Sequence, residues 1–246
     1  MTDPYDDDAA GACVLDDPVG ASLRGHHAHL ARRHGLASGY APDVATFVAL
    51  PPGPGPAAWK DLAELLGGRG GFADLFSSPA TPPPDWEPAF SLDGVQLVRP
   101  AREEAADETG AVERTADETG VVELGAADVP EMLALVERTR PGPFRPRTHE
   151  LGSYLGIRAG GALVALAGER LRPPGWTELS AVCTAPEARG RGHAARLVGA
   201  LAARIEARGE RPFLHVAAAN TPALALYRRL GFEVRRTVTF RGFLVP

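Results

Sequence analysis

Hydrophobic and polar positions follow a regular pattern in the second half of the chain. Runs that alternate in polarity or are rich in β-branched residues predict strands over residues 121–124, 154–158, 162–171, 177–184, 213–216 and 233–240. Apolar residues at helical spacing predict helices after residue 128, around residues 197–205 and over residues 222–230. Strands and helices therefore alternate late in the chain, and this order predicts a mixed α/β domain.

Several residues with known end preferences mark the boundaries of these elements. Asp128 is expected to cap the first helix, with Pro130 in its first turn, and Pro141 is expected to end it. Gly160 and Gly161 separate two strands and predict a hairpin.

The first hundred residues are less regular. Trp59, Leu62 and Leu66 lie at helical spacing within residues 57–66, so we expect a helix there. Residues 46–50 and 95–99 have the composition of strands, and proline-rich runs lie between the elements. This half contains enough apolar residues to fold, but it carries no motif that indicates a chemistry.

Two acidic segments divide the chain. Residues 1–17 are acidic and poor in large apolar residues, so we expect a disordered tail. A direct repeat, ADETGAVERT followed by ADETGVVELG, begins at residue 106 and has the composition of a solvated linker. We therefore expect an N-terminal α/β region over residues 18–100, an acidic linker over residues 101–122 and a second domain over residues 123–246.

Charge and composition narrow the classes of function. The formal net charge is −5, yet arginines outnumber acids after residue 125, so the C-terminal half is basic and suits a ligand with several phosphates. Nucleic acid is not expected as a partner, because basic and aromatic residues are not interleaved and no reading helix is evident. The acidic N-terminus and the absence of a long apolar run predict a soluble cytoplasmic protein without a membrane partner.

No metal site is expected. The two cysteines are far apart in sequence and neither belongs to a CxxC pair. Histidines cluster in HHAHLARRHG, where His27 and His34 would share a helical face, but no carboxylate or thiolate lies at ligand spacing. Solvated histidines on a helix are the better interpretation of this cluster.

The loop after the strand over residues 177–184 has the form of an anion site. The sequence RGRGHAA, residues 189–195, opens a helix whose first amides lack intrahelical partners and whose dipole adds positive potential. Gly190 and Gly192 would let the backbone approach a phosphate closely, and Arg189 and Arg191 could add charge-assisted contacts. The loop lacks the Gly-Lys-Ser/Thr of a Walker motif and the third glycine of a dinucleotide fingerprint. A glycine-eased turn with two solvated arginines remains the alternative.

A second motif follows about 25 residues further on. The pattern RxxGxA and the later sequence NTPALALYRRLGF together resemble the two halves of the signature of the GNAT acetyltransferase superfamily. The strand and turn before the loop are similar to a bacterial subfamily that carries an extra N-terminal half. This resemblance covers about half of the chain. It implies a mixed, mostly antiparallel sheet flanked by helices, and acetyl-CoA as a co-substrate without a metal.

The resemblance also implies which residues hold the co-substrate. The strand that ends at Thr184 would bind the pantetheine arm through its backbone, Val182 being the expected oxyanion donor at a bulge. The loop amides would hold the pyrophosphate, and Asn220 would contact a pantetheine amide. The expected co-substrate residues are Val182, Cys183, Thr184, Arg189, Gly190, Arg191, Gly192, His193, Ala194, Ala195 and Asn220.

The expected catalytic residues are Tyr227, His215 and Glu178, with Glu169 as a further candidate base. Tyr227 matches the tyrosine that protonates the departing thiolate in the family. His215 lies where several relatives place a glutamate base, and imidazole has a suitable reference pKa of ~6.5. Glu178 and Glu169 are alternative bases that could act through water. His215 could equally be a hydrogen-bonded strand histidine, and either glutamate could simply face solvent.

The expected function is N-acetylation of a primary amine by direct attack, the acceptor being a small molecule or a peptide. A non-catalytic acyl-CoA sensor is the alternative, which Tyr227 and Asn220 argue against. The N-terminal half is either a degenerate copy of the same fold or the source of the acceptor pocket. Neither the acceptor's identity nor the oligomeric state follows from the sequence.

Overall fold

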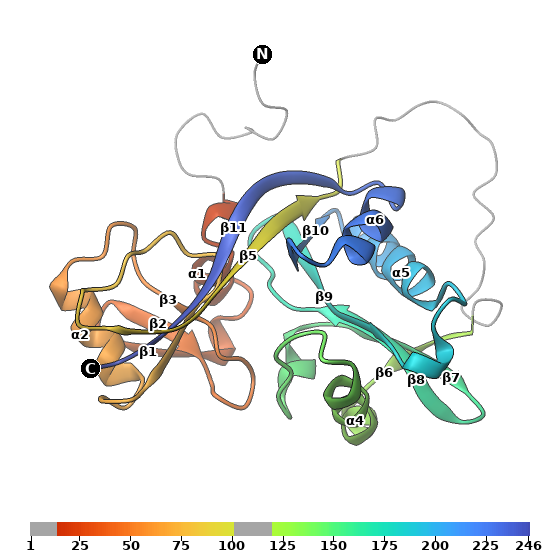
Figure 1. The fold of residues 1–246 in the computed structure, drawn as a ribbon, viewed down its shortest axis with the longest axis horizontal. Coiled ribbons are helices and arrows are strands. Elements are labelled where there is room, and N and C mark those ends of the chain that lie inside the picture. The colour runs from red at the N-terminus through yellow and green to blue at the C-terminus, as the bar shows by residue number, and fades with distance from the viewer. Residues whose placement is uncertain (1–13, 101–119) are drawn as a thin grey trace, which may run out of the picture.

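A computed structural model describes residues 14–100 and 120–246 and shows two lobes joined by long strands (Figure 1). An eight-stranded sheet with the order β4-β11-β5-β10-β9-β8-β7-β6 runs from the larger lobe into the smaller one. All of its pairs are antiparallel except β9 with β10. The fold is thus a mixed α/β structure built on a mostly antiparallel sheet, as expected.

The elements of the second half agree closely with the sequence pattern. The strands are β6 (Val121–Leu124), β7 (Tyr154–Ala159), β8 (Ala162–Glu169), β9 (Trp176–Thr184), β10 (Arg211–Ala217) and β11 (Glu233–Leu244). The helices are α4 (Val129–Thr139), α5 (His193–Ala207) and α6 (Thr221–Arg229). Helices α4 and α5 cover opposite faces of the sheet (Figure 1), and α5 buries Leu197, Leu201 and Ile205 completely against it.

The smaller lobe contains the three-stranded sheet β1-β2-β3. Its elements are α1 (Pro18–Arg24), β1 (Ala31–His34), β2 (Ala37–Tyr40), β3 (Val48–Ala49) and α2 (Pro56–Leu65). The helix expected at residues 57–66 is therefore present. The helical interpretation of the histidine cluster is wrong: His34 ends an edge strand, and His27 is completely buried.

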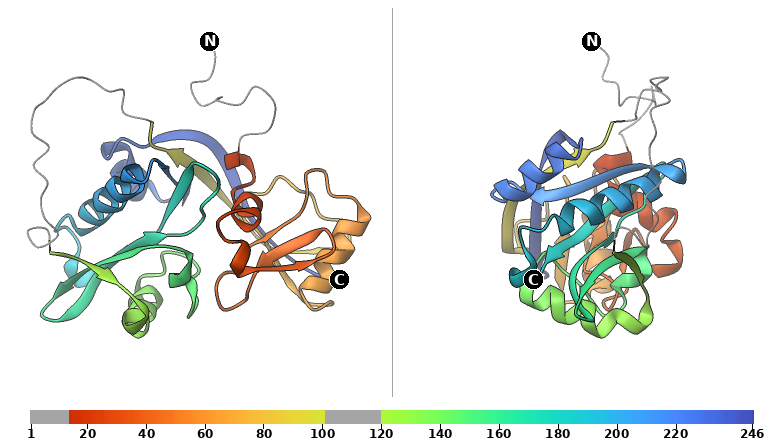
Figure 2. Two further views of the ribbon diagram at one scale, coloured as in Figure 1. Left: turned by 180° about the vertical axis from the view of Figure 1, so that it is seen from behind. Right: turned by 90° about the vertical axis from the view of Figure 1, so that its right-hand side faces the viewer.

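Two strands cross from one lobe to the other. β5 (Glu87–Val98) and β11 pair along their length and arch over the molecule (Figures 1 and 2). β5 lies between β11 and β10, and β11 also pairs with β4 (Phe72–Leu75). The N-terminal region predicted over residues 18–100 and the domain predicted over residues 123–246 thus share one sheet, and the last residues of the chain return to the smaller lobe.

Two local expectations need correction. Residues 14–17, placed in a disordered tail, instead form a 3-10 turn and the cap of α1, and Leu15 is completely buried. Asp128 does not cap α4 through its side chain, because its oxygens accept from the Gly125 amide and from Arg158. The rest of the tail, residues 1–13, and most of the repeat, residues 101–119, lie outside the described residues.

Candidate active site

The centre of the large sheet contains a split between two strands. β9 and β10 pair in parallel from Trp176 with Arg211 as far as Leu179 with Leu214. Beyond that point β9 continues to Thr184 and β10 to Ala217, but no pairing joins them. Because backbone groups of a strand point alternately to both sides, the far part of β9 directs N–H and C=O groups into the split.

A bulge lies on β9 beside this split. The register with β8 moves from Gly168 opposite Ser180 to Leu166 opposite Cys183, so β9 carries one extra residue. Ala181 absorbs it with a left-handed backbone, φ 54°. Bulges of this kind re-aim backbone groups next to active sites. The sequence resemblance implied a bulge in this strand, with Val182 as the oxyanion donor. In the structure the bulged residue is Ala181, which directly precedes Val182.

The loop after β9 leaves the first amides of α5 open. Gly190 and Gly192 have φ of 77° and 75°, and a Cβ at either position would point into open space. Gly192 is the N-cap residue and has no side chain to satisfy the amides of the first turn. These amides, together with the helix dipole, form a cradle that fits a phosphate group.

The side chains around the cradle are polar and mostly exposed. The Arg189 side chain points toward the end of β9, where its Nε lies 3.4 Å from the Thr184 carbonyl oxygen. His193 Nδ1 lies 2.6 Å from Arg196 Nη2, and partial burial together with the charges of Arg196 and Arg191 lowers the pKa of His193. His193 is therefore a neutral acceptor, while the arginines give the loop its positive charge.

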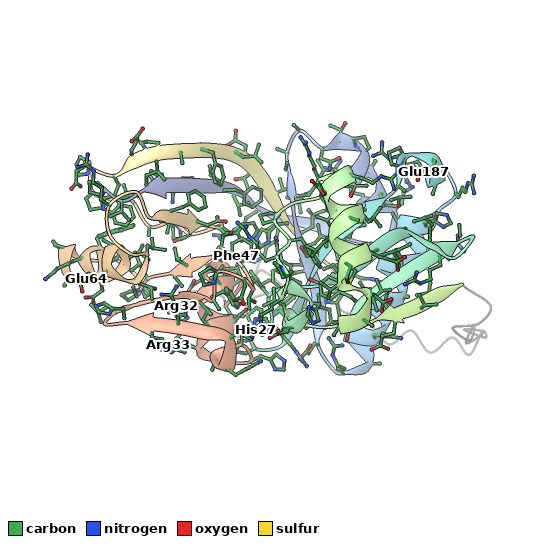
Figure 3. All side chains as sticks on the ribbon, turned by 90° about the horizontal axis from the view of Figure 1, so that it is seen from below. His27, Arg32, Arg33, Phe47, Glu64 and Glu187 are labelled. Atoms are coloured by element: carbon green, nitrogen blue, oxygen red, sulfur yellow. The ribbon has the colours of Figure 1, made fainter. Side chains whose placement is uncertain are left out.

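A cavity of about 570 Å³ connects the split strands to the smaller lobe. Phe47, which lines it, lies midway between the lobes in Figure 3. The residues expected from the sequence that line this cavity are Val182, Cys183, Thr184, Arg189, His215, Asn220 and Tyr227. The expected residues Glu178, Gly190, Arg191, Gly192, His193, Ala194 and Ala195 are not part of its lining.

Tyr227 is one of the residues that line the cavity. The residue is 7% exposed and belongs to α6, where its ring packs against Phe232. Its hydroxyl makes no hydrogen bond within the described chain, yet it is not among the fully buried polar atoms without a partner there. Burial raises the pKa of Tyr227 to about 12, so the phenol holds its proton at neutral pH.

Asn220 also has a structural role at the start of α6. Asn220 is the N-cap of α6, and its Oδ1 accepts from the Ala223 amide at 3.3 Å. The side chain is consequently held in place by the helix. Its Nδ2 group is the atom left to contact a ligand in the cavity.

The tautomer of His215 follows from its neighbours. Glu178 Oε1 lies 2.7 Å from Nδ1, and a carboxylate at this distance accepts a proton from that nitrogen. Gln96 Nε2 lies 3.1 Å from the other ring nitrogen, and its amide is oriented by Arg235, which donates to Gln96 Oε1 at 2.9 Å. His215 therefore carries its proton on Nδ1, and its Nε2 accepts from Gln96.

Gln96 was not singled out in the sequence. It is completely buried, and its amide nitrogen also donates to the Leu15 carbonyl oxygen. The only local signal is a polar residue at an inward position of a strand, in VQLV. Its partner in β10 is 119 residues away in the chain, so the contact cannot be read from local pattern.

The two glutamates proposed as alternative bases are both buried and paired, and neither faces solvent. Arg170 donates from Nε to Glu178 Oε2 at 2.8 Å and from Nη2 to Glu178 Oε1 at 2.6 Å. Burial acts to raise the pKa of Glu178, but Arg170 and His215 outweigh it and lower the pKa to about 2. Glu169 is 3% exposed and accepts from Arg208 at 2.9 Å. Burial also lowers the pKa of His215 and outweighs the opposing effect of Glu178.

Cys183 and the potential metal ligands are the remaining candidate features. Cys183 is buried, and burial raises the pKa of its thiol, which suits packing better than nucleophilic attack. Among residues 14–100 and 120–246, no group of three or more potential metal ligands is found. Within the same ranges no helix is long and apolar enough to cross a bilayer.

Known proteins resemble this chain in both sequence and fold. The model of the FR47-like protein family matches residues 154–241, which include the split strands and α6. A GNAT-family protein from Novosphingobium aromaticivorans is 38% identical, with 94% of this chain and 98% of that chain covered and a TM-score of 0.81. A GCN5-related N-acetyltransferase from Kribbella flavida shares the fold at 21% identity, with 95% and 96% covered and a TM-score of 0.57. A search of the curated proteins found no match.

Proposed function

Since the chain belongs to the GNAT family of N-acetyltransferases, we propose that it transfers the acetyl group of acetyl-CoA to a primary amine. The acceptor is a small molecule or a peptide end that binds in the cavity between the lobes. The observation that carries this proposal is the convergence at one cavity of the β9–β10 split, the bulge at Ala181 and Tyr227.

The described residues fit acetyl-CoA along its length. The open amides at the start of α5 and the arginines of the loop suit its pyrophosphate, since neither glycine places a side chain in that space. The unpaired edge of β9 from Val182 to Thr184 and the Nδ2 group of Asn220 suit the amides of the pantetheine arm. Acetyl-CoA supplies the activated acyl group as a thioester.

Two groups act on the reacting atoms. The Val182 amide, at the bulge, stabilises the negative charge that develops on the thioester oxygen. The Tyr227 hydroxyl donates its proton to the departing thiolate, because Tyr227 is a neutral donor that lines the cavity together with Cys183 and Asn220.

Water is a better base for the acceptor ammonium than His215 or Glu178. The Nε2 lone pair of His215 already accepts from Gln96, and its side chain is 1% exposed. Glu178 is a poor proton acceptor, because its pKa is held near 2. We therefore assign the His215–Glu178 pair a positioning role: it orders Arg170 and the wall of the cavity.

The first experiment is a calorimetric titration of the full chain with acetyl-CoA, CoA and ATP. We expect saturable binding of acetyl-CoA and CoA and none of ATP. Gly192→Leu should abolish binding, since its side chain would fill the space in front of the cradle. Gly53→Leu is the control, because Gly53 also has a positive φ and open surroundings but lies in the smaller lobe. A folded wild-type chain that binds neither thioester nor CoA would overturn the proposal.

A further inference from the structure

Side chains of both charges line the cavity. Arg189 belongs to the loop beside β9, where the phosphates are expected. Asp74 lines the same cavity from β4, at the far end of the strand order β4-β11-β5-β10-β9. Arg170, which also lines it, is bidentately paired with Glu178, so that pair adds no net charge. Among the described residues that line the cavity, Asp74 is the only carboxylate.

The Asp74 carboxylate is buried but only half satisfied. The residue is 5% exposed, and its Oδ2 accepts from Thr46 Oγ1 at 2.6 Å. Its Oδ1 has no hydrogen-bond partner in the parts of the chain that the structure describes. Burial raises the pKa of Asp74, although Thr46 and Arg170 act to lower it. A buried carboxylate with an open oxygen is costly unless a cation or donor completes its shell.

The walls near Asp74 are apolar. Phe47, Phe76 and Phe240 are buried in contact with one another, with ring centroids 4.6 and 4.8 Å apart along the row. The Arg170 guanidinium, whose charge is balanced by Glu178, lies over two of these rings, 5.1 Å from the Phe47 centroid and 4.5 Å from the Phe76 centroid. Phe90 and Leu92, from β5, also line the cavity, yet they are 41% and 46% exposed. These two side chains offer an apolar surface at the mouth.

We propose that Asp74 binds the cationic group of the acceptor, and that Phe90 and Leu92 hold an apolar body attached to it. The acceptor class is thus a hydrophobic organic ammonium, such as an arylalkylamine, and not an acidic peptide or an anionic small molecule. This inference rests on the proposed function, since it names the acceptor of the same site. It also gives the smaller lobe the task of selecting the acceptor.

The test uses the full chain saturated with CoA and two probes that differ in charge. Calorimetric titration with 2-phenylethylammonium should show saturable binding, and 3-phenylpropionate, which carries the opposite charge, should show none. Asp74→Asn preserves size and can keep the contact with Thr46, but it should weaken binding of the ammonium by about 10- to 100-fold, the range for a lost charge-assisted hydrogen bond. Asp85→Asn, at an exposed site of the same lobe, is the matched control.

A second variant keeps the inference testable if Asp74→Asn does not fold. Leu92→Ser changes an exposed side chain, so it should weaken the binding of 2-phenylethylammonium and leave the binding of CoA intact. The inference is overturned if both probes bind equally, or if Asp74→Asn binds the ammonium as tightly as the wild type does. The wild-type chain and each variant are also titrated with acetyl-CoA. If the wild-type chain does not bind acetyl-CoA, the proposed function itself has failed, and this outcome is distinct from failure of the inference.

Discussion

Glu178 Oε1 lies 2.7 Å from His215 Nδ1 and 2.6 Å from Arg170 Nη2, so one buried oxygen holds both the histidine and the arginine of the cavity wall. Glu178 lies one residue before the last paired residue of β9, and His215 lies one residue beyond the last paired residue of β10, so their contact spans the point where the two strands separate. His215 and Glu178 therefore belong to one hydrogen-bonded network, which stabilises the sheet where β9 and β10 separate.

Replacing Glu178 should destabilise the protein strongly. Glu178→Gln leaves the Arg170 guanidinium buried without a counter-charge, which costs about 3–5 kcal/mol of unfolding free energy. Urea denaturation measures this loss. Glu64→Gln is the control, because the Glu64 carboxylate is half exposed and its pair with His34 is worth at most about 1 kcal/mol. Equal midpoints for the two variants would contradict the structural role.

Changing His215 separates positioning from catalysis. We expect His215→Asn to lower kcat without removing the acidic limb of the pH profile of kcat/KM, since His215 holds its proton on Nδ1 and its Nε2 is occupied by Gln96. Steady-state kinetics between pH 5 and 9 measure both quantities. Loss of the limb would show that His215 is the base after all.

Tyr227→Phe should lower kcat by about 10²- to 10⁴-fold, the usual effect of losing a general acid, and leave acetyl-CoA affinity unchanged. Because burial raises the pKa of Tyr227 to about 12, the wild-type enzyme should keep its proton donor loaded well above neutral pH. Tyr154→Phe is the matched control: that hydroxyl is buried without a hydrogen-bond partner among residues 14–100 and 120–246, and Tyr154 does not line the cavity. Unchanged turnover in Tyr227→Phe would favour a sensor over an enzyme.

Two variants of Asn220 distinguish its helix cap from a contact with the co-substrate. Asn220→Asp retains an oxygen that accepts from the Ala223 amide, so stability should be preserved, but it lacks the Nδ2 donor and should bind acetyl-CoA more weakly. Asn220→Ala should lose both, with about 1 kcal/mol of stability removed with the cap. Calorimetry measures the affinity for acetyl-CoA, and thermal unfolding measures the stability. Wild-type affinity of Asn220→Asp for acetyl-CoA would exclude a contact between Nδ2 and the co-substrate.

His27 should make stability depend on pH. Its Nε2–H donates to the Leu151 carbonyl oxygen at 3.0 Å and its Nδ1 accepts from the Tyr40 hydroxyl at 2.8 Å, so the folded protein holds it neutral. Burial lowers its pKa from 6.5 to about 4. Between these values the unfolded chain binds more protons, so stability falls as pH decreases from 6.5 to 4, by up to about 1.4 kcal/mol per pH unit.

Urea midpoints at pH 7 and pH 5 measure this dependence. His27→Gln should flatten it, whereas His29→Gln, at an exposed site, should leave it as in the wild type. An unchanged slope in His27→Gln would assign the acid sensitivity to other groups.

The elements around the proposed co-substrate site could be predicted from the sequence because their signals are local. The pattern and turn residues of the second half placed α5, α6, β9 and β10 to within a few residues, and Gly190 and Gly192 are glycines because the loop needs positive φ. Local pattern failed in the smaller lobe. β1 is a polar edge strand that exists only because β2 pairs with it, so its sequence, ARRH, could be mistaken for a helix.

By itself the sequence determined the type of domain, the glycine loop that opens α5 and the place of Tyr227 in α6, since each depends on residues close together in the chain. The tertiary structure alone decided that β5 enters the centre of the large sheet and brings Gln96 to His215, 119 residues away. It alone brought Asp74 into the same cavity as Tyr227 and buried His27 against Leu151. Such pairings are set by long-range strand order and by the burial of side chains, and neither leaves a periodic signal in the chain.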